Sequence, residues 1–157
     1  MKKFFKKLIY VCFIIVYFFQ IKQVKSLVPY YYLPTIKNLE REGFSIGKNA
    51  YQLLYFGQYE QSLNMAKLAV KINKNDEKLW LILSETQIAN KLYKNALISL
   101  NKAKEINPKN SDTYILQSNI YLKISKLQKA KTALETALKI ESNNYKAIFQ
   151  LGNILLM

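Results

Sequence analysis

The chain has 157 residues, of which 50% are hydrophobic, and it contains only four glycines and three prolines. This composition excludes wholesale disorder and favours long helices over a turn-rich β fold. The formal net charge is +14, but Arg41 is the single arginine among 24 basic residues. Because arginine supplies the planar group that reads phosphates and bases, we do not expect this chain to bind nucleic acid.

The sequence also argues against catalysis. It has no histidine and a single cysteine, Cys12, which lies in an apolar stretch near the start. The commonest general base and metal ligand is therefore missing, and no internal disulfide can form. We predict that the chain is not an enzyme and that it has no catalytic, cofactor-binding or metal-binding residues.

Residues 1–26 follow the order of a secretory signal peptide, with a basic start, an apolar stretch at residues 8–19 and a polar end. As a helix, the apolar stretch would span about 18 Å, against about 30 Å of bilayer hydrocarbon. We expect a signal that is cleaved after Ser26. Lys22 and Lys25 precede that site and disfavour cleavage, so a retained membrane anchor stays open. In both cases the positive-inside rule places the following domain outside the cytoplasm.

Residues 27–42 begin with three adjacent tyrosines between Pro29 and Pro34. Both prolines disfavour a helix, because proline lacks the backbone N–H and restricts the residue before it. We expect a linker or a capping segment here.

From residue 43 onward the sequence repeats at an interval of 34 residues. The segment ALISLNKAKEINPKN at 96–110 is matched by SLNMAKLAVKINKND at 62–76 and by AKTALETALKIESNN at 130–144. Its small residues Ala96 and Ala103 are seven apart, which is nearly two helical turns, so they share one helix face. Small residues on one face allow a second helix to approach closely, so the pattern predicts antiparallel helical hairpins.

Turn and cap residues fall at matching places in each unit. Gly57 interrupts the first unit between its two helices, and Pro108 ends the second unit because proline cannot continue a helix interior. Asp76, Asn110 and Asn144 precede the next helix in each case and are suited to cap it.

These features resemble the tetratricopeptide repeat (TPR) family, whose units have 34 residues. Gln87 departs from the family pattern, which usually has tyrosine there. The resemblance implies an all-α TPR solenoid of three helical hairpins plus one terminal helix, with an apolar N-terminal signal or anchor helix before it. Its domain would cover residues 43–157, with repeats at 43–76, 77–110 and 111–144 and a partial repeat at 145–157. The central repeat carries the pattern best, at Trp80, Leu83, Ser84, Ala96, Leu100, Ala103 and Pro108.

The resemblance further implies that the first helix of each hairpin lines a concave groove that binds another protein. Leu54, Ile88 and Leu122 belong either to this groove or to the core. The groove residues that we expect to contact a partner are Tyr51, Tyr55, Lys78, Leu81, Glu85, Asp112, Ile115, Asn119 and Lys123.

One class of TPR partner is not expected. TPR co-chaperones grip the C-terminal carboxylate of a chaperone with lysine, asparagine and arginine at set groove positions. None of these residue types stands there in this chain, so we do not expect it to bind such a tail. The corresponding residues are Gly47, Tyr51, Ile82, Asp112 and Leu116.

A looser resemblance, to small membrane-associated TPR proteins of cyanobacteria and plastids, implies a role in assembling photosynthetic complexes. We therefore expect a non-enzymatic protein-interaction scaffold, exported to or anchored in a periplasm or thylakoid lumen. The alternative is a nucleic-acid-binding helical repeat protein that uses the surplus lysines.

The terminal helix at residues 145–157 is strongly apolar. We expect Ile148, Leu151, Ile154 and Leu155 to pack on the preceding hairpin. Phe149, Leu156 and Met157 would then be partly exposed and would support a weak homodimer through this end.

Overall fold

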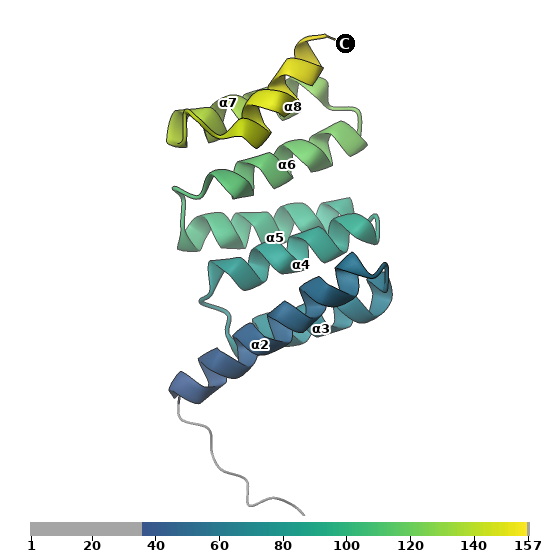
Figure 1. Ribbon diagram of the computed structural model, residues 1–157, viewed down its shortest axis with the longest axis vertical. Helices are drawn as coiled ribbons and strands as arrows, with labels where there is room; N and C mark the ends of the chain where they lie inside the picture. Colours follow the sequence, from purple (N-terminus) through teal and green to yellow (C-terminus); the bar gives the residue numbers. More distant parts are fainter. Residues whose placement is uncertain (1–35, 157) are drawn as a thin grey trace, which may run out of the picture. The chain divides into compact units, whose positions relative to one another are not determined.

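The computed structural model describes residues 36–156, so the expected signal or anchor, the cleavage site and the tyrosine-rich segment lie outside the described residues. Residues Ile36–Met157 form one compact unit. Its described part contains seven α-helices and no strand (Figure 1). The helices are α2 (Ile36–Tyr55), α3 (Tyr59–Ile72), α4 (Glu77–Ala89), α5 (Tyr93–Ile106), α6 (Ser111–Lys123), α7 (Leu127–Ile140) and α8 (Tyr145–Leu155).

The helices form three hairpins, α2–α3, α4–α5 and α6–α7, which stack in chain order, and α8 packs on α7 (Figure 1). The expected solenoid of three hairpins plus a terminal helix is therefore confirmed. One boundary differs, because α2 begins at Ile36, well before the expected repeat start at Gly43. Residues 36–42, which we expected to belong to a linker or capping segment, form the first turns of this helix.

Small residues close each hairpin. The same two repeat positions, one on each helix, carry only alanine or serine, and all six side chains are 0% exposed. In the first hairpin the Ser62 hydroxyl also donates a hydrogen bond of 2.7 Å to the carbonyl of Ala50. Because larger side chains would hold the helices apart, these positions set the distance between them. The pairs are Ala50 with Ser62, Ser84 with Ala96, and Ser118 with Ala130.

The turn inside each hairpin has the same backbone conformation. Gly57, Lys91 and Ser125 occupy equivalent positions and have positive φ angles of 74°, 59° and 57°. The next residue's N–H then bonds back to the helix, as in Leu92 to the Gln87 carbonyl at 2.8 Å. This left-handed C-terminal cap suits glycine but strains other residues.

The connections between hairpins are also repeated. Asn110 and Asn144 cap α6 and α8 with their side-chain oxygens, as expected, and Asp76 caps α4. The side-chain amide nitrogen of each asparagine also bonds to the first residue of the repeat that this asparagine ends. Asn110 donates to Glu77 at 2.9 Å, and Asn144 donates to the Ser111 hydroxyl at 3.1 Å. One side chain therefore both starts a helix and ties it to the preceding hairpin.

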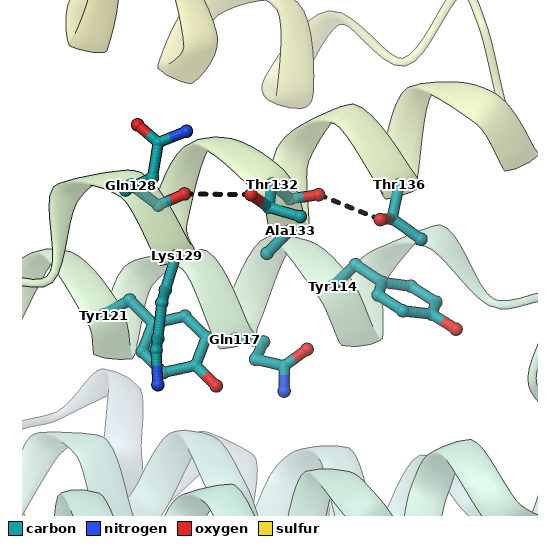
Figure 2. Close-up of a pocket in the computed structure, with 8 residues that line it drawn as sticks. All are labelled: Tyr114, Gln117, Tyr121, Gln128, Lys129, Thr132, Ala133 and Thr136. Atoms are coloured by element: carbon teal, nitrogen blue, oxygen red, sulfur yellow. Dashed lines mark hydrogen bonds between the residues drawn. The ribbon is translucent and has the colours of Figure 1, made fainter.

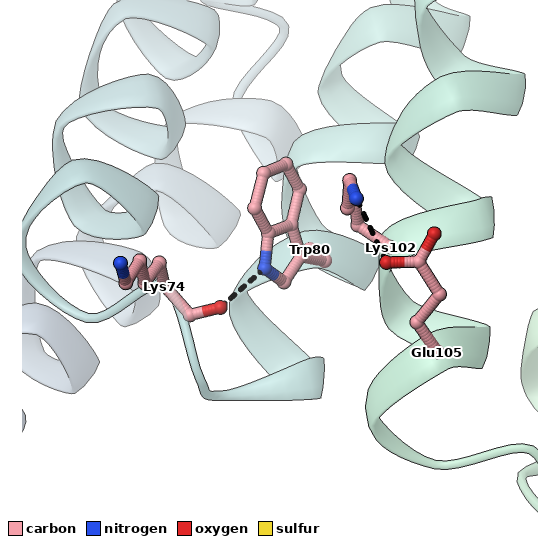
Figure 3. Close-up of polar contacts among 4 residues, drawn as sticks. All are labelled: Lys74, Trp80, Lys102 and Glu105. Atoms are coloured by element: carbon pink, nitrogen blue, oxygen red, sulfur yellow. Dashed lines mark hydrogen bonds and ion pairs between the residues drawn. The ribbon is translucent and has the colours of Figure 1, made fainter.

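An aromatic side chain adds a second tie at the same connections. The indole nitrogen of Trp80 donates a 2.8 Å hydrogen bond to the Lys74 carbonyl (Figure 3). Tyr114 makes the equivalent bond to the Pro108 carbonyl at 3.3 Å.

The departure at Gln87 has a physical explanation. Gln87 is 5% exposed and Ser99 on the facing helix is 3% exposed. The Ser99 hydroxyl donates to the Gln87 side-chain oxygen at 2.7 Å. In the third repeat the same positions hold Tyr121 and Ala133. A buried amide is thus tolerated where a hydroxyl satisfies it.

The strained turns give a first prediction. Replacing Lys91 or Ser125 with glycine should raise the free energy of unfolding by about 0.5–1 kcal/mol, because glycine adopts positive φ without a Cβ penalty. Gly57→Ala should lower it by a similar amount. Urea unfolding of the three variants measures these changes.

Lys91→Ala is the matched control, since it removes the charge but keeps the strained Cβ. An equal gain from Lys91→Ala and Lys91→Gly would show that charge, and not backbone conformation, controls stability at this turn.

Candidate functional site

The first helices of neighbouring hairpins lie side by side, because α2 contacts α4 and α4 contacts α6. We call the surface that these three helices share the groove. Its expected residues therefore come from three segments that are separated in the sequence but adjacent in the solenoid.

The α2 end of the groove is aromatic and open. Phe44, Tyr51 and Tyr55 are spaced so that they share one face of the helix. Their exposed fractions are 51%, 52% and 83%. Large apolar side chains that cluster on one exposed face mark a contact surface more often than isolated ones do.

The α4 segment is more enclosed. Leu81, Glu85 and Ile88 are all half-buried. Leu81 and Ile88 pack against the core cluster formed by Ala96, Leu100 and Ile120. Leu81 and Ile88 therefore both contribute to the core, and each keeps part of its surface exposed.

The α6 segment differs from expectation at Ile115. This side chain is 4% exposed and belongs to the core cluster of the last hairpin, so it offers almost no surface to a partner. Leu122 is half-buried and packs against the same cluster. Other expected groove residues are more accessible: Lys78, Asp112 and Lys123 are exposed, and Asn119 is half-buried.

Charged groups from three helices meet near Glu85. Burial raises the pKa of the Glu85 carboxyl, and the nearby Asp112 carboxylate raises it further, while Lys146 acts in the opposite direction. Asp112 lies on α6 and Lys146 on α8. The groove thus has an acidic centre that is partly withdrawn from water.

The terminal helix packs partly as expected. Ile154 is buried and Leu151 packs against the core cluster of the last hairpin, whereas Ile148 and Leu155 are 51% and 63% exposed. In the complete hairpins the equivalent face is covered by the second helix of the hairpin. No helix of the described part covers this face of α8. A Cβ added at Gly152 would meet no atom within 4 Å.

A shallow cavity of about 280 Å³, which the sequence did not predict, lies between α6 and α7 (Figure 2). The hydroxyls of Thr132 and Thr136 bond to carbonyls of their own helix, so they are already satisfied. Lys129 is the one charged side chain that lines the cavity. The lining residues are Tyr114, Gln117, Tyr121, Gln128, Lys129, Thr132, Ala133 and Thr136.

Residues 36–156 offer neither a metal-binding cluster nor a membrane-spanning helix. This part of the chain has no cluster of three or more histidine, cysteine, aspartate or glutamate residues placed to hold a metal ion. None of its helices is long and apolar enough to cross a membrane.

Comparison with solved structures shows the fold. The first TPR domain of Spaghetti (RPAP3) bound to the HSP90 peptide SRMEEVD aligns with a TM-score of 0.68 and 18% identity, over 74% of this chain and 93% of that one. The second TPR domain of human RPAP3 in complex with the HSP70 peptide SGPTIEEVD gives 0.67 and 18%, over 74% and 98%. The Yersinia enterocolitica type III secretion chaperone SycD with a peptide of the translocator YopD gives 0.64 and 18%, over 71% and 91%.

Glu85 gives a pH prediction. Its pKa is higher in the folded chain than in the unfolded chain, so its contribution to stability is full at acid pH and is lost as pH rises through the folded value. The free energy of unfolding of Glu85→Gln should therefore increase relative to that of wild type as pH rises from 4 to 8.

Denaturant unfolding across that range measures the difference. Glu135→Gln makes the same chemical change at an exposed position on α7 and serves as the control. A Glu85→Gln difference that is constant with pH would contradict the assignment of a destabilising charge to this site.

Sequence comparison identifies the repeats. No curated protein matches the chain significantly. The tetratricopeptide repeat family model matches residues 77–110 and 111–144, which are the bounds expected for the second and third repeats. Those two segments are therefore tetratricopeptide repeats, and the described unit has the fold of a TPR domain.

Proposed function

We propose that this chain is a protein-interaction scaffold that holds a segment of a partner protein in the groove. The observation that carries the proposal is the run of exposed aromatic side chains on α2, Phe44, Tyr51 and Tyr55, together with the half-buried Leu81 on α4. An extended or helical segment with apolar anchors would cover these side chains and exclude water from them. The solved TPR domains with bound peptides support the same use of the fold.

The chemistry of the groove favours an apolar segment over an acidic tail. A side chain at the place of Gly47 would collide with Leu79, so a lysine there would require the buried Leu79 side chain to shift. Ile82 is half-buried beside this glycine, and Asp112 adds negative charge. A C-terminal carboxylate would therefore meet neither a basic group nor an amide at these positions.

More specifically, we propose that the chain helps to assemble a membrane complex, such as a photosynthetic one. Its support is the apolar leader at residues 8–19 together with the resemblance to membrane-associated TPR proteins. The domain would then work beside a membrane, outside the cytoplasm, in a periplasm or thylakoid lumen.

We further propose that α8 pairs with α8 of a second copy. The face formed by Ile148, Gly152 and Leu155 corresponds to the face that each complete hairpin covers with its own second helix. Gly152 takes the place of Ser84 and Ser118, which are 0% exposed where helices touch. Two antiparallel copies of α8 could cross at this glycine, and each carries Lys146 as its one charged residue.

The contact area indicates that this dimer is weak. Four exposed side chains of α8, each offering on the order of 100 Å², would bury about 800 Å² over two copies. That value lies below the range of stable specific interfaces. The side chains are Tyr145, Ile148, Phe149 and Leu155.

The groove predicts a position-dependent cross-link. The full chain with a photo-reactive amino acid in place of Tyr51 or Leu81 should cross-link the same protein in solubilised membranes of its source. The same group in place of Ile98, which is 62% exposed on α5, should not. Mass spectrometry of the products measures this.

Tyr51→Ala and Leu81→Ala should each reduce recovery of that protein by about tenfold, as expected for central apolar anchors. Ile98→Ala is the matched control. Equal recovery from all three variants would show that the partner binds elsewhere.

Gly152 provides the test of self-association. Sedimentation of the full chain at tens of micromolar should show a monomer–dimer equilibrium, and Gly152→Gln should shift it to monomer. The substitution adds a Cβ that meets no atom within 4 Å, so the fold should be unchanged. A wild-type monomer at these concentrations would overturn the pairing of α8.

A further inference from the structure

The three turns within the hairpins lie along one edge of the solenoid, together with the C-terminal end of α8 (right side of Figure 1). We call this set, residues 55–61, 89–95, 123–129 and 155–156, the turn edge. The connections between hairpins, residues 72–78, 106–112 and 140–146, lie along the opposite edge (Figure 1).

The two edges differ in charge. The turn edge carries five lysines and one acidic residue, Glu60. The connections on the opposite edge carry four lysines and four acidic residues. Positive charge is therefore concentrated on one side of the array and balanced on the other. The turn-edge lysines are Lys91, Lys94, Lys123, Lys126 and Lys129.

Large apolar side chains project from the same edge. Leu156, Tyr55 and Phe56 are 89%, 83% and 73% exposed, and the rings of Tyr55 and Phe56 meet edge to face at 5.6 Å. Tyr59, Leu92, Leu127 and Leu155 are exposed as well. Aromatic and aliphatic tips among lysines are typical of surfaces that sit in the headgroup region of a bilayer.

A cavity of about 520 Å³ lies between the second and third turns. Its apolar lining comes from Leu92, Tyr93, Leu97 and Ile124, and lysines from both turns line it too. Such a site combines space for apolar groups with a cationic rim, which suits an anionic amphiphile. The lysines are Lys91, Lys94 and Lys126.

We propose that the turn edge binds the surface of a bilayer that contains anionic lipids. Each lysine near such a surface adds attraction, and the apolar tips enter the headgroup region. A nucleic acid would use the lysines but would leave the leucine tips and the apolar cavity in water. Tyr55 lies where the turn edge meets the groove, so this contact would present the groove beside the membrane.

The test separates this contact from any attachment through the leader. The full chain, with Cys12→Ser, carries an environment-sensitive fluorophore at Leu92→Cys on the turn edge or at Asn75→Cys on the opposite edge. Vesicles contain brominated phosphatidylcholine with or without 30% phosphatidylglycerol. We expect quenching of the label at position 92 with phosphatidylglycerol only, lost at high salt, and no quenching at position 75.

Charge reversal on each edge gives the matched comparison. The double variant Lys91→Glu and Lys126→Glu should raise the lipid concentration needed for half-maximal quenching at position 92 by tenfold or more. Lys74→Glu with Lys109→Glu makes the same change of charge on the opposite edge and should leave it unchanged.

Three outcomes would overturn the proposal. The first is equal quenching of both labels, and the second is equal quenching by neutral and by anionic vesicles. The third is an equal loss of quenching at position 92 from both charge reversals. A labelled oligonucleotide that binds through Lys91 and Lys126, without quenching by vesicles, would assign the turn edge to nucleic acid instead.

Discussion

The contact of small residues inside each hairpin is the constraint on which the solenoid depends. Ala50 meets Ser62, and the same contact recurs in the next two hairpins with no exposed surface. Because α4 packs on both helices of the first hairpin, the distance between the two helices of one hairpin determines where the next hairpin packs. The groove and the turn edge are both consequences of this spacing, since each is assembled from neighbouring hairpins.

Where a position departs from the repeat, a compensating contact is found or a surface is left open. Gln87 is buried in place of the usual tyrosine, and Ser99 on the facing helix satisfies its side-chain oxygen. Gly152 continues the small-residue contact on α8, but no described helix covers it. The small-residue position that closes three hairpins is thus left uncovered on α8 within the described residues.

The two edges of the solenoid are stabilised by different contacts. On one edge, Asn110 and Asn144 cap a helix and bond to the preceding unit, so these side chains serve the stability of the stack. On the turn edge, backbone hydrogen bonds close each turn, and the Asn90 amide also bonds to the preceding hairpin, at the Tyr59 carbonyl at 2.9 Å. Side chains such as Lys91 and Leu92 remain exposed there. This division leaves the turn edge available for the membrane contact, and the groove available for the partner segment, that we propose.

The sequence by itself determined the hairpins, their turns and their caps. Small residues seven apart, the turn at Gly57 and the cap at Asn110 act through local backbone chemistry, so a 34-residue period suffices to find them. The aromatic end of the groove was predictable too, because Tyr51 and Tyr55 share a face of one helix.

Only the tertiary structure decided which of these faces meet water. It buries Ile115, exposes Ile148 and Leu155, and extends α2 back to Ile36. It also places Asp112 and Lys146 where their charges act on Glu85, and gathers lysines of two different turns onto one edge. These outcomes depend on how neighbouring hairpins rotate and cover one another, which helical periodicity within a single unit does not specify.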